Sequence, residues 1–272
     1  MGKCARRKVL NGMRSMDIVF IGAGRLATQL AQALCAQGHH VTAVYSRTMA
    51  SARQLAELVG ARATDDLYAL PHEADAFIIA VKDTALSDLL PHLAEGRSQQ
   101  RFYHTAGSMP LDVFKGTMSH YGVIYPMQTF SKERRVDFAR VPLFIEASDD
   151  DTLDVARRIA GSVSQRVMVL SSEQRRYLHL AAVFACNFTN HCYALSAEIL
   201  RRHDIPFDVM LPLIDETAAK VHELQPAQAQ TGPAVRYDEN VIEAHRQLLA
   251  DMPDVQSLYT QLSQSIHLHN QK

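Results

Sequence analysis

The apolar residues of the first 170 positions form short continuous runs, and these alternate with stretches in which apolar residues recur every three or four positions. Short apolar runs indicate buried strands, and the 3.6-residue spacing indicates helices. The first unit, DIVFIGAGRLATQLAQALCAQGHHVTAVYSRT from Asp17, predicts a strand, a glycine-rich turn, a helix and a second strand. Further strands are expected at ARAT, ADAFIIAV, RFYHTA, YGVIYP, VPLFIEA and RVMVL, and further helices at MASARQLAELVG, ALSDLLPHLAEG and DTLDVARRIAGSVS. This alternation predicts an α/β domain with a doubly wound, mainly parallel sheet.

The pattern changes after Leu170, where helical spacing replaces the short apolar runs. Helices are expected over 171–204 and 207–223, and a last helical stretch ends near residue 265, after the linker ELQPAQAQTGPAVRYDEN. We therefore predict a dinucleotide-binding α/β domain over 16–171 and an all-α domain over 172–272. Residues 1–15, MGKCARRKVLNGMRS, are basic and lack the apolar segment of a secretory signal. They are expected to be a disordered tail, or to lie upstream of a start at Met13 or Met16.

Composition excludes several classes of function. Apolar residues make up 47% of the chain and charged residues 21%, and the formal net charge is −1. This balance is typical of a globular protein and gives no basic surplus for nucleic acid or an anionic membrane. No apolar run approaches the roughly 18 residues of a membrane span. The four scattered cysteines indicate reduced thiols in the cytoplasm, and no His or Cys spacing indicates a metal site.

The turn IGAGRLA carries a G-x-G-x-x-A pattern between a strand and a helix. Gly22 permits a tight turn, Gly24 lets the backbone approach a pyrophosphate, and Ala27 permits close packing of helix against strand. The helix N-terminus then holds the anion through its free N–H groups. We predict dinucleotide binding by Gly22, Ala23, Gly24, Arg25, Leu26 and Ala27, the alternative being a turn without a ligand.

The end of the second strand favours NADP over NAD. NAD sites place an acidic residue about 20 positions after the turn, where it binds the ribose 2′-hydroxyl. Here the strand ends in Ser46, Arg47 and Thr48, which suit a 2′-phosphate. A charge-assisted hydrogen bond contributes roughly 1.5–3 kcal/mol, or about 10- to 150-fold discrimination. The alternative is a solvated arginine at a strand end.

Three more strand ends point toward the same crevice, because ligands of doubly wound sheets lie beyond the carboxyl ends of the strands. Small residues in HTAGS would let a nicotinamide ring lie against the backbone. The additional cofactor residues expected here are Val81, Lys82, Thr105, Ala106 and Gly107, and Gln128 of YPMQTF is expected to contact substrate. His104 either takes part in the site or makes a local hydrogen bond at its strand end. Lys82 and Asp83 are also typical of solvated loop charges.

The segment HLAAVFACNFTN, residues 179–190, reads as a helix of a hydrophobic core that nevertheless carries three polar residues. Burial of a polar group without a partner costs roughly 2–7 kcal/mol. At about 100° per residue, His179, Asn187 and Asn190 share one sector of the helix. Such a polar seam suits a cleft, and the alternative is that the three residues satisfy one another, or cap backbone, in a dimer core.

A second concentrated patch is TGPAVRYDENVIEAH. Arg236 has the forked guanidinium that binds a carboxylate bidentately, and Thr231 is a neighbouring hydroxyl. We predict that both contact substrate, although a solvated role for Arg236 is equally open. Asp238 is expected first of all to cap the helix that follows.

Five stretches, GAGRLA, HTAGS, YPMQTF, YLHLAAVFACNFTN and TGPAVRYDENVIEAH, together resemble a family of Rossmann-like NADP oxidoreductases whose helical half is a domain of unknown function. They span residues 17–245. The wider group contains pyrroline-5-carboxylate reductase, ketopantoate reductase and 6-phosphogluconate dehydrogenase. The resemblance implies an N-terminal Rossmann domain, a helical C-terminal domain, a homodimer formed by the helical halves and an active cleft between the domains.

The chain departs from the dehydrogenase relatives in its first long helix. Those relatives carry a catalytic lysine followed four residues later by asparagine, whereas His179 is followed by Val183 and the nearest asparagine is Asn187. A histidine side chain still suits proton transfer near neutral pH.

The sequence therefore supports an NADPH-dependent reductase of a small C=O or C=N substrate. In this hypothesis His179 donates the proton, Asn187 orients the substrate, and His104 assists or positions. Gln128, Asn190, Thr231 and Arg236 bind the substrate. The alternative is a catalytically silent, dimeric NADP-binding sensor or scaffold. A methyltransferase-like nucleotide binder fits the glycine turn and the SRT stretch less well.

Overall fold

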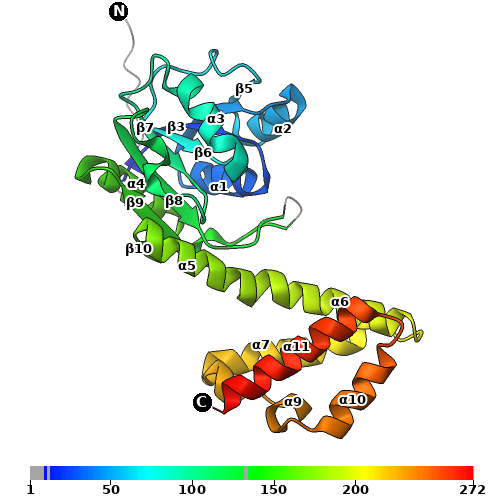
Figure 1. Cartoon of the computed structure of the whole chain (residues 1–272). Helices are drawn as coiled ribbons and strands as arrows, with labels where there is room; N and C mark the ends of the chain where they lie inside the picture. Colours follow the sequence, from blue (N-terminus) through cyan, green and yellow to red (C-terminus); the bar gives the residue numbers. More distant parts are fainter. Residues whose placement is uncertain (1–8, 11–12, 132–133, 272) are drawn as a thin grey trace, which may run out of the picture. The chain divides into compact units, whose positions relative to one another are not determined.

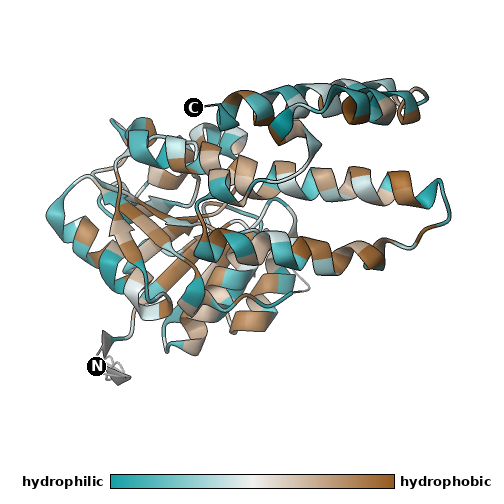
Figure 2. Ribbon diagram, turned by 90° about the horizontal axis from the view of Figure 1, so that it is seen from below, coloured by the Kyte–Doolittle hydropathy of each residue, from teal (hydrophilic) through white to brown (hydrophobic). Residues whose placement is uncertain are grey.

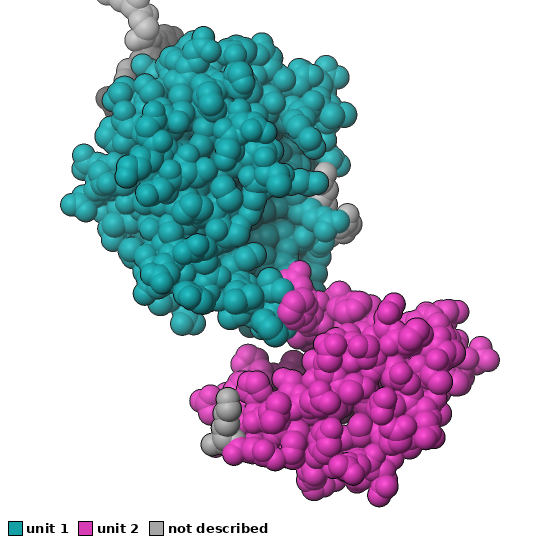
Figure 3. All heavy atoms as spheres, viewed as in Figure 1, with its two compact units in different colours: residues 1–186 teal, residues 187–272 magenta. Residues whose placement is uncertain are grey.

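The computed structural model describes residues 9–10, 13–131 and 134–271. The chain divides into two compact units, residues 1–186 and 187–272, which are coloured separately in Figure 3. The last strand ends at Val169, next to the predicted boundary at residue 171, but the units separate only after Cys186. Each unit is described by itself below.

An eight-stranded sheet forms the centre of the first unit (Figure 1), in the order β10-β9-β8-β7-β6-β3-β4-β5. All neighbouring strands are parallel except β8 and β9, which are antiparallel. The strands are β3 (Asp17–Ile21), β4 (His40–Tyr45), β5 (Arg62–Thr64), β6 (Ala76–Ile79), β7 (Arg101–His104), β8 (His120–Pro126), β9 (Leu143–Ala147) and β10 (Val167–Val169). The strand pattern and the mainly parallel sheet predicted from the sequence are thereby confirmed.

Helices cover both faces of the sheet because its central strands are apolar on both sides. The strands are mostly brown in the hydropathy colouring of Figure 2. One core cluster joins β3 to α1 (Arg25–Ala36), α2 (Met49–Val59) and α4 (Asp150–Val163). A second cluster joins the opposite face to α3 (Asp83–Ala94) and to the 3₁₀ turn η1 (Leu111–Phe114). A second 3₁₀ turn, η2, spans Phe138–Arg140. The doubly wound α/β prediction is confirmed.

The amino-terminal extension departs from the prediction where the structure describes it. Val9–Leu10 (β1) and Met13–Arg14 (β2) pair as two short antiparallel strands, which the prediction of a tail did not include. Residues 1–8 and 11–12 lie outside the described part of the chain.

The second unit contains helices and no strand among its described residues. Its elements are α6 (Thr189–Arg201), the 3₁₀ turn η4 (Phe207–Met210), α7 (Leu211–Glu223), α8 (Pro226–Ala229), α9 (Pro233–Arg236), α10 (Glu239–Leu248) and α11 (Pro253–Asn270). The all-α prediction is confirmed. The predicted linker contains two short helices, and the last helix extends to Asn270 instead of ending near residue 265. Within the described residues, no helix combines the length and the apolar composition needed to span a membrane.

The helix expected over 171–204 is interrupted. Helix α5 (Ser172–Ala182) begins with a capping box, in which the Ser171 side chain accepts from the Gln174 backbone N–H and the Gln174 side chain accepts from the Ser171 N–H. A π-helical segment, η3 (Val183–Phe188), separates α5 from α6. A π-helix forms i→i+5 hydrogen bonds and is frequent at functional sites.

Candidate functional site

The turn between β3 and α1 has the geometry that the G-x-G-x-x-A pattern predicts. Gly22 has φ +110°, and a Cβ at this position would lie 2.3 Å from the carbonyl oxygen of Ala80. A Cβ on Gly24 would meet nothing within 4 Å, so space is open above the turn. Helix α1 has no side-chain cap and no acidic residue in its first turn. Its N-terminal N–H groups and positive dipole end therefore suit a pyrophosphate.

The end of β4 places an arginine beside a second helix N-terminus. Arg47 is exposed, and its side chain makes no hydrogen bond or ion pair with the residues that the structure describes. The Thr48 hydroxyl serves as the cap of α2 and accepts from the Ser51 N–H at 3.4 Å. Arg47 is thus free to bind a 2′-phosphate, whereas Thr48 already has a structural role.

The loops after β6 and β7 are joined to each other. The Thr105 hydroxyl donates to the Ile79 carbonyl at 3.3 Å, and the Ser108 hydroxyl donates to the Asp83 carboxylate. Lys82 is exposed at the start of α3, as expected for a solvated charge. These contacts hold the small residues 105–107 at the carboxyl edge of the sheet, where the nicotinamide half of a dinucleotide was expected.

His104 does not have the environment of a proton donor. Its side chain is 1% exposed and stacks on Phe114 at a ring distance of 5.6 Å. Nδ1 accepts from the Ala106 N–H at 3.1 Å. Burial, and secondarily the charge of Arg175, lower the pKa of His104 to about 3, so the ring is neutral at physiological pH. Of the two roles left open by the sequence, the local hydrogen bond at the strand end is the one observed.

His179 lies at the carboxyl ends of β7 and β8. The Tyr125 hydroxyl and His179 Nδ1 are 3.1 Å apart, and their rings meet edge to face. Gly107 lies directly against both rings, since a Cβ there would be 2.7 Å from His179 Nδ1 and 2.9 Å from Tyr125 Cζ. The structure therefore brings three elements together at one point: the loop after β7, the end of β8 and helix α5.

A buried ion pair fixes the first turn of α5 beneath His179. Arg175 is 1% exposed, and its guanidinium donates to the Glu146 carboxylate at 2.5 Å and to the Met109 carbonyl at 2.6 Å. Glu146 also accepts from the Ser172 N–H at 2.9 Å and from the Ser172 hydroxyl at 2.8 Å. Since Arg175 and His179 are one helical turn apart, this network sets where the histidine ring lies.

We expect Arg175→Met to destabilise the protein by about 3 kcal/mol, because the substitution leaves the partly buried Glu146 carboxylate without its counter-ion. The matched control is Arg157→Met, which removes an exposed ion pair with Asp154 and should cost at most about 1 kcal/mol. Urea denaturation of both variants measures the difference. Equal stability of the two variants would contradict a locking role for Arg175.

Four of the predicted site residues lie in the second unit, and all four are exposed: Asn187, Asn190, Thr231 and Arg236. Within the single chain the segment 179–190 is not buried, since Phe184 is 63% and Phe188 50% exposed; burial in a dimer core stays a prediction. The prediction that His179, Asn187 and Asn190 share one face of a helix assumed α-helical geometry throughout. The segment Val183–Phe188 is a π-helix with more residues per turn, so this assumption does not hold. Asp238 caps α10 through the Val241 N–H, as predicted.

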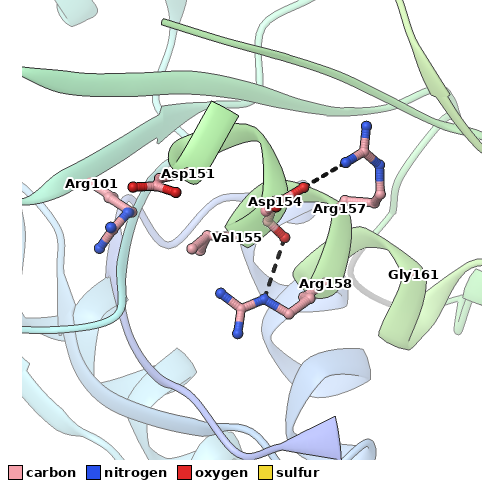
Figure 4. A pocket seen from close by; sticks show the side chains of 7 residues that line it. All are labelled: Arg101, Asp151, Asp154, Val155, Arg157, Arg158 and Gly161. Atoms are coloured by element: carbon pink, nitrogen blue, oxygen red, sulfur yellow. Dashed lines mark hydrogen bonds and ion pairs between the residues drawn. The ribbon is translucent and has the colours of Figure 1, made fainter. Parts of the chain in front are cut away.

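The first unit has several pockets, including the two that follow. One, of about 650 Å³, is lined by Gln128 and the residues that follow it. The other, of about 750 Å³ and shown in Figure 4, lies at Arg101, the amino end of β7, opposite the end that carries His104. In it the Asp154 carboxylate accepts from Arg157 and pairs with its charge, and the Asp154 backbone carbonyl accepts from Arg158. Among the described residues, no cluster of His, Cys, Asp or Glu could hold a metal ion.

Sequence reasoning did not single out two residues of this site. Tyr125 lies in the stretch YPMQTF, and its position at the carboxyl end of a predicted strand could have indicated a role in the site. The ion pair of Arg175 could not be predicted from a local pattern, because its partner Glu146 is 29 residues away on another element.

The sheet and the open glycine turn define a dinucleotide-binding protein of the Rossmann class. Residues 17–103 match the family described as "NADP oxidoreductase coenzyme F420-dependent", and residues 141–266 match "Domain of unknown function (DUF2520)". A solved structure from Bacteroides fragilis, named a putative NADP oxidoreductase, is 56% identical, with a TM-score of 0.90, and the match covers 93% of this chain and 98% of that one. The chain therefore belongs to this family of NADP oxidoreductases, and its cofactor is NADP.

More distant structures share the fold. A Thermotoga maritima protein is 23% identical with a TM-score of 0.78, and the match covers 94% of this chain and 100% of that one. An imine reductase from Myxococcus stipitatus, solved in complex with NADP⁺, is 16% identical with a TM-score of 0.64, and the match covers 92% of this chain and 91% of that one. No curated protein sequence matches this chain.

Proposed function

We propose that the protein is an NADPH-dependent reductase of a small carbonyl or imine compound, with His179 as the proton donor. The observation that carries this proposal is the contact of His179 with Tyr125 and Gly107. It lies at the same carboxyl edge of the sheet as the glycine turn. The fold shared with an imine reductase that binds NADP⁺ supports this class of substrate.

Bound NADPH supplies a hydride to the carbon of the C=O or C=N group. The chain has to supply a proton to the oxygen or nitrogen, so that an alcohol or amine results. Tyr125 contacts Nδ1 of His179, which leaves Nε2 as the ring nitrogen that meets the substrate. The buried Tyr125 hydroxyl, whose pKa is raised mainly by burial, stays protonated and orients the imidazole ring.

The substrate-binding roles of Asn187, Asn190, Gln128, Thr231 and Arg236 remain part of this proposal, as does a homodimer formed by the helical unit. Large apolar side chains exposed on that unit support the dimer: Val209, Leu211, Leu213, Val221, Leu248, Leu262 and Leu268. The free cysteines Cys35, Cys186 and Cys192 support a location in the cytoplasm.

The reductase proposal is tested by following NADPH oxidation with a panel of small ketones, aldehydes and cyclic imines. Turnover of at least one member, with the matching alcohol or amine as product, is expected. NADPH binding without turnover across the panel would favour the alternative of a catalytically silent sensor or scaffold.

Replacement of Arg47 with glutamine is expected to weaken NADPH binding by about 10- to 150-fold, because the 2′-phosphate loses a charge-assisted hydrogen bond. NADH binding should change by less than about twofold, because NADH lacks that phosphate. Fluorescence titration of the wild type and of Arg47→Gln, each with NADPH and with NADH, measures these changes in affinity. An equal loss for NADPH and NADH would show that Arg47 does not contact the 2′-phosphate.

A further inference from the structure

Gly107, in the loop after β7, is buried, and its backbone does not require a glycine. It is not among the glycines with positive φ, the region in which a residue with a Cβ is strained. The space around it is the constraint. A Cβ would lie 2.7 Å from His179 Nδ1, 2.9 Å from His179 Cγ and 2.9 Å from Tyr125 Cζ, whereas carbon atoms in contact are normally about 3.5–4.0 Å apart. The two rings, and not the backbone, leave room only for a glycine.

Neither ring can give way without breaking a contact of the site. Tyr125 is 8% exposed, and its ring packs against Phe144 at a centroid distance of 6.3 Å. His179 is only partly buried, but Cγ is the ring atom nearest to the helix backbone, so a methyl group against Cγ has to turn the whole ring. Such a turn removes Nδ1 from the Tyr125 hydroxyl, which lies 3.1 Å away.

The loop that carries Gly107 is held on both sides of this residue. Before it, the Thr105 N–H donates to the Ile79 carbonyl at 3.1 Å, which ties the loop to the end of β6. After it, the Met109 carbonyl accepts from the Arg175 guanidinium at 2.6 Å, which ties the loop to the first turn of α5. A side chain at position 107 would therefore be pressed against the two rings, because the loop is not free to move away from them.

We propose that Gly107 is a positioning residue of the reductase, whose missing side chain lets the His179 ring reach Tyr125 and so keeps the transferable proton on Nε2. The inference rests on the proposed reductase function. The Tyr125 hydroxyl donates to Nδ1, and the proton of the neutral imidazole is then on Nε2, the nitrogen that meets the substrate. This role differs from the cofactor contact that the sequence predicted for Gly107, because the side on which a Cβ would project is filled by the two rings.

The first test compares Gly107→Ala with the same substitution at Gly161, where a Cβ meets nothing within 4 Å. Gly107→Ala should lower kcat by about 10- to 100-fold, because a misplaced catalytic group costs up to about 100-fold. Its dissociation constant for NADPH should change by less than about twofold, and Gly161→Ala should change neither quantity. Loss of NADPH affinity with unchanged kcat in Gly107→Ala would assign the residue to the cofactor and overturn the proposal.

A double-mutant cycle separates positioning from a general effect on folding. Gly107→Ala should lower the Tm of the wild type by about 2–10 °C, as overpacking does, and should lower that of His179→Ala by less than half as much, because the ring is gone. The kcat of the double variant should equal that of His179→Ala alone. Equal Tm losses in the two backgrounds would show that the methyl group does not meet the histidine, and would overturn the proposal.

Nitrogen chemical shifts of the His179 ring, assigned by their absence in His179→Ala, report the positioning without a substrate. The neutral ring should carry its proton on Nε2 in the wild type and on a mixture of Nε2 and Nδ1 in Gly107→Ala. An unchanged proton position in Gly107→Ala would overturn the proposal even if the wild type reduces a carbonyl or imine. A changed proton position would support the positioning, and a wild type without turnover would then count against the proposed function alone.

Discussion

Replacement of His179 with alanine is expected to lower kcat by about 100-fold or more, since a positioned general acid contributes about 10²- to 10⁴-fold. The dissociation constant of NADPH should change by less than about twofold, because the glycine turn and Arg47 lie on other strand ends. The measurement combines NADPH oxidation with the accepted substrate and fluorescence titration with NADPH. Unchanged turnover would remove the proton-donor role from His179.

Two further variants sharpen this result. His203→Ala removes an exposed histidine of the second unit and should leave kcat unchanged. Tyr125→Phe keeps the ring and removes the hydroxyl that contacts Nδ1, so it should lower kcat by less than the histidine variant does. Equal kcat losses in all three variants would indicate a general effect on folding and not on proton transfer.

Replacement of Gly22 with alanine is expected to destabilise the protein by about 2–4 kcal/mol and to abolish measurable NADPH binding. The methyl group would approach the Ala80 carbonyl oxygen to within 2.3 Å, and φ +110° is strained for any residue with a Cβ. Thermal unfolding and fluorescence titration measure the two effects. Wild-type stability together with wild-type affinity would show that the turn can move aside.

Two other glycines separate stability from cofactor binding. Gly24→Ala meets open space and keeps an extended backbone, so stability should change by less than about 1 kcal/mol. NADPH affinity should nevertheless fall by at least about tenfold, because the methyl group takes the space of the pyrophosphate. Gly161→Ala, on the exposed side of the last turn of α4, should stabilise the protein by about 0.5–1 kcal/mol with unchanged affinity. Retained NADPH affinity in Gly24→Ala would contradict the position assigned to the pyrophosphate.

Local features were the ones that the sequence predicted well. The strands and helices of the first unit follow the spacing of apolar residues, because that spacing decides which faces are buried. The turn at Gly22 and the cap at Asp238 follow from backbone and hydrogen-bond preferences within a few residues. The change from strands to helices near residue 171 is visible for the same reason.

The sequence by itself therefore determined the alternation of strands and helices, the glycine turn and the arginine at the end of β4, because each depends on neighbouring residues. Only the tertiary structure decided that His104 is enclosed and neutral, since burial is set by elements that pack from elsewhere in the chain. It also decided that Tyr125 contacts His179, 54 residues away, and that Arg175 pairs with Glu146. Contacts over such separations depend on strand order and helix packing, which no local pattern encodes.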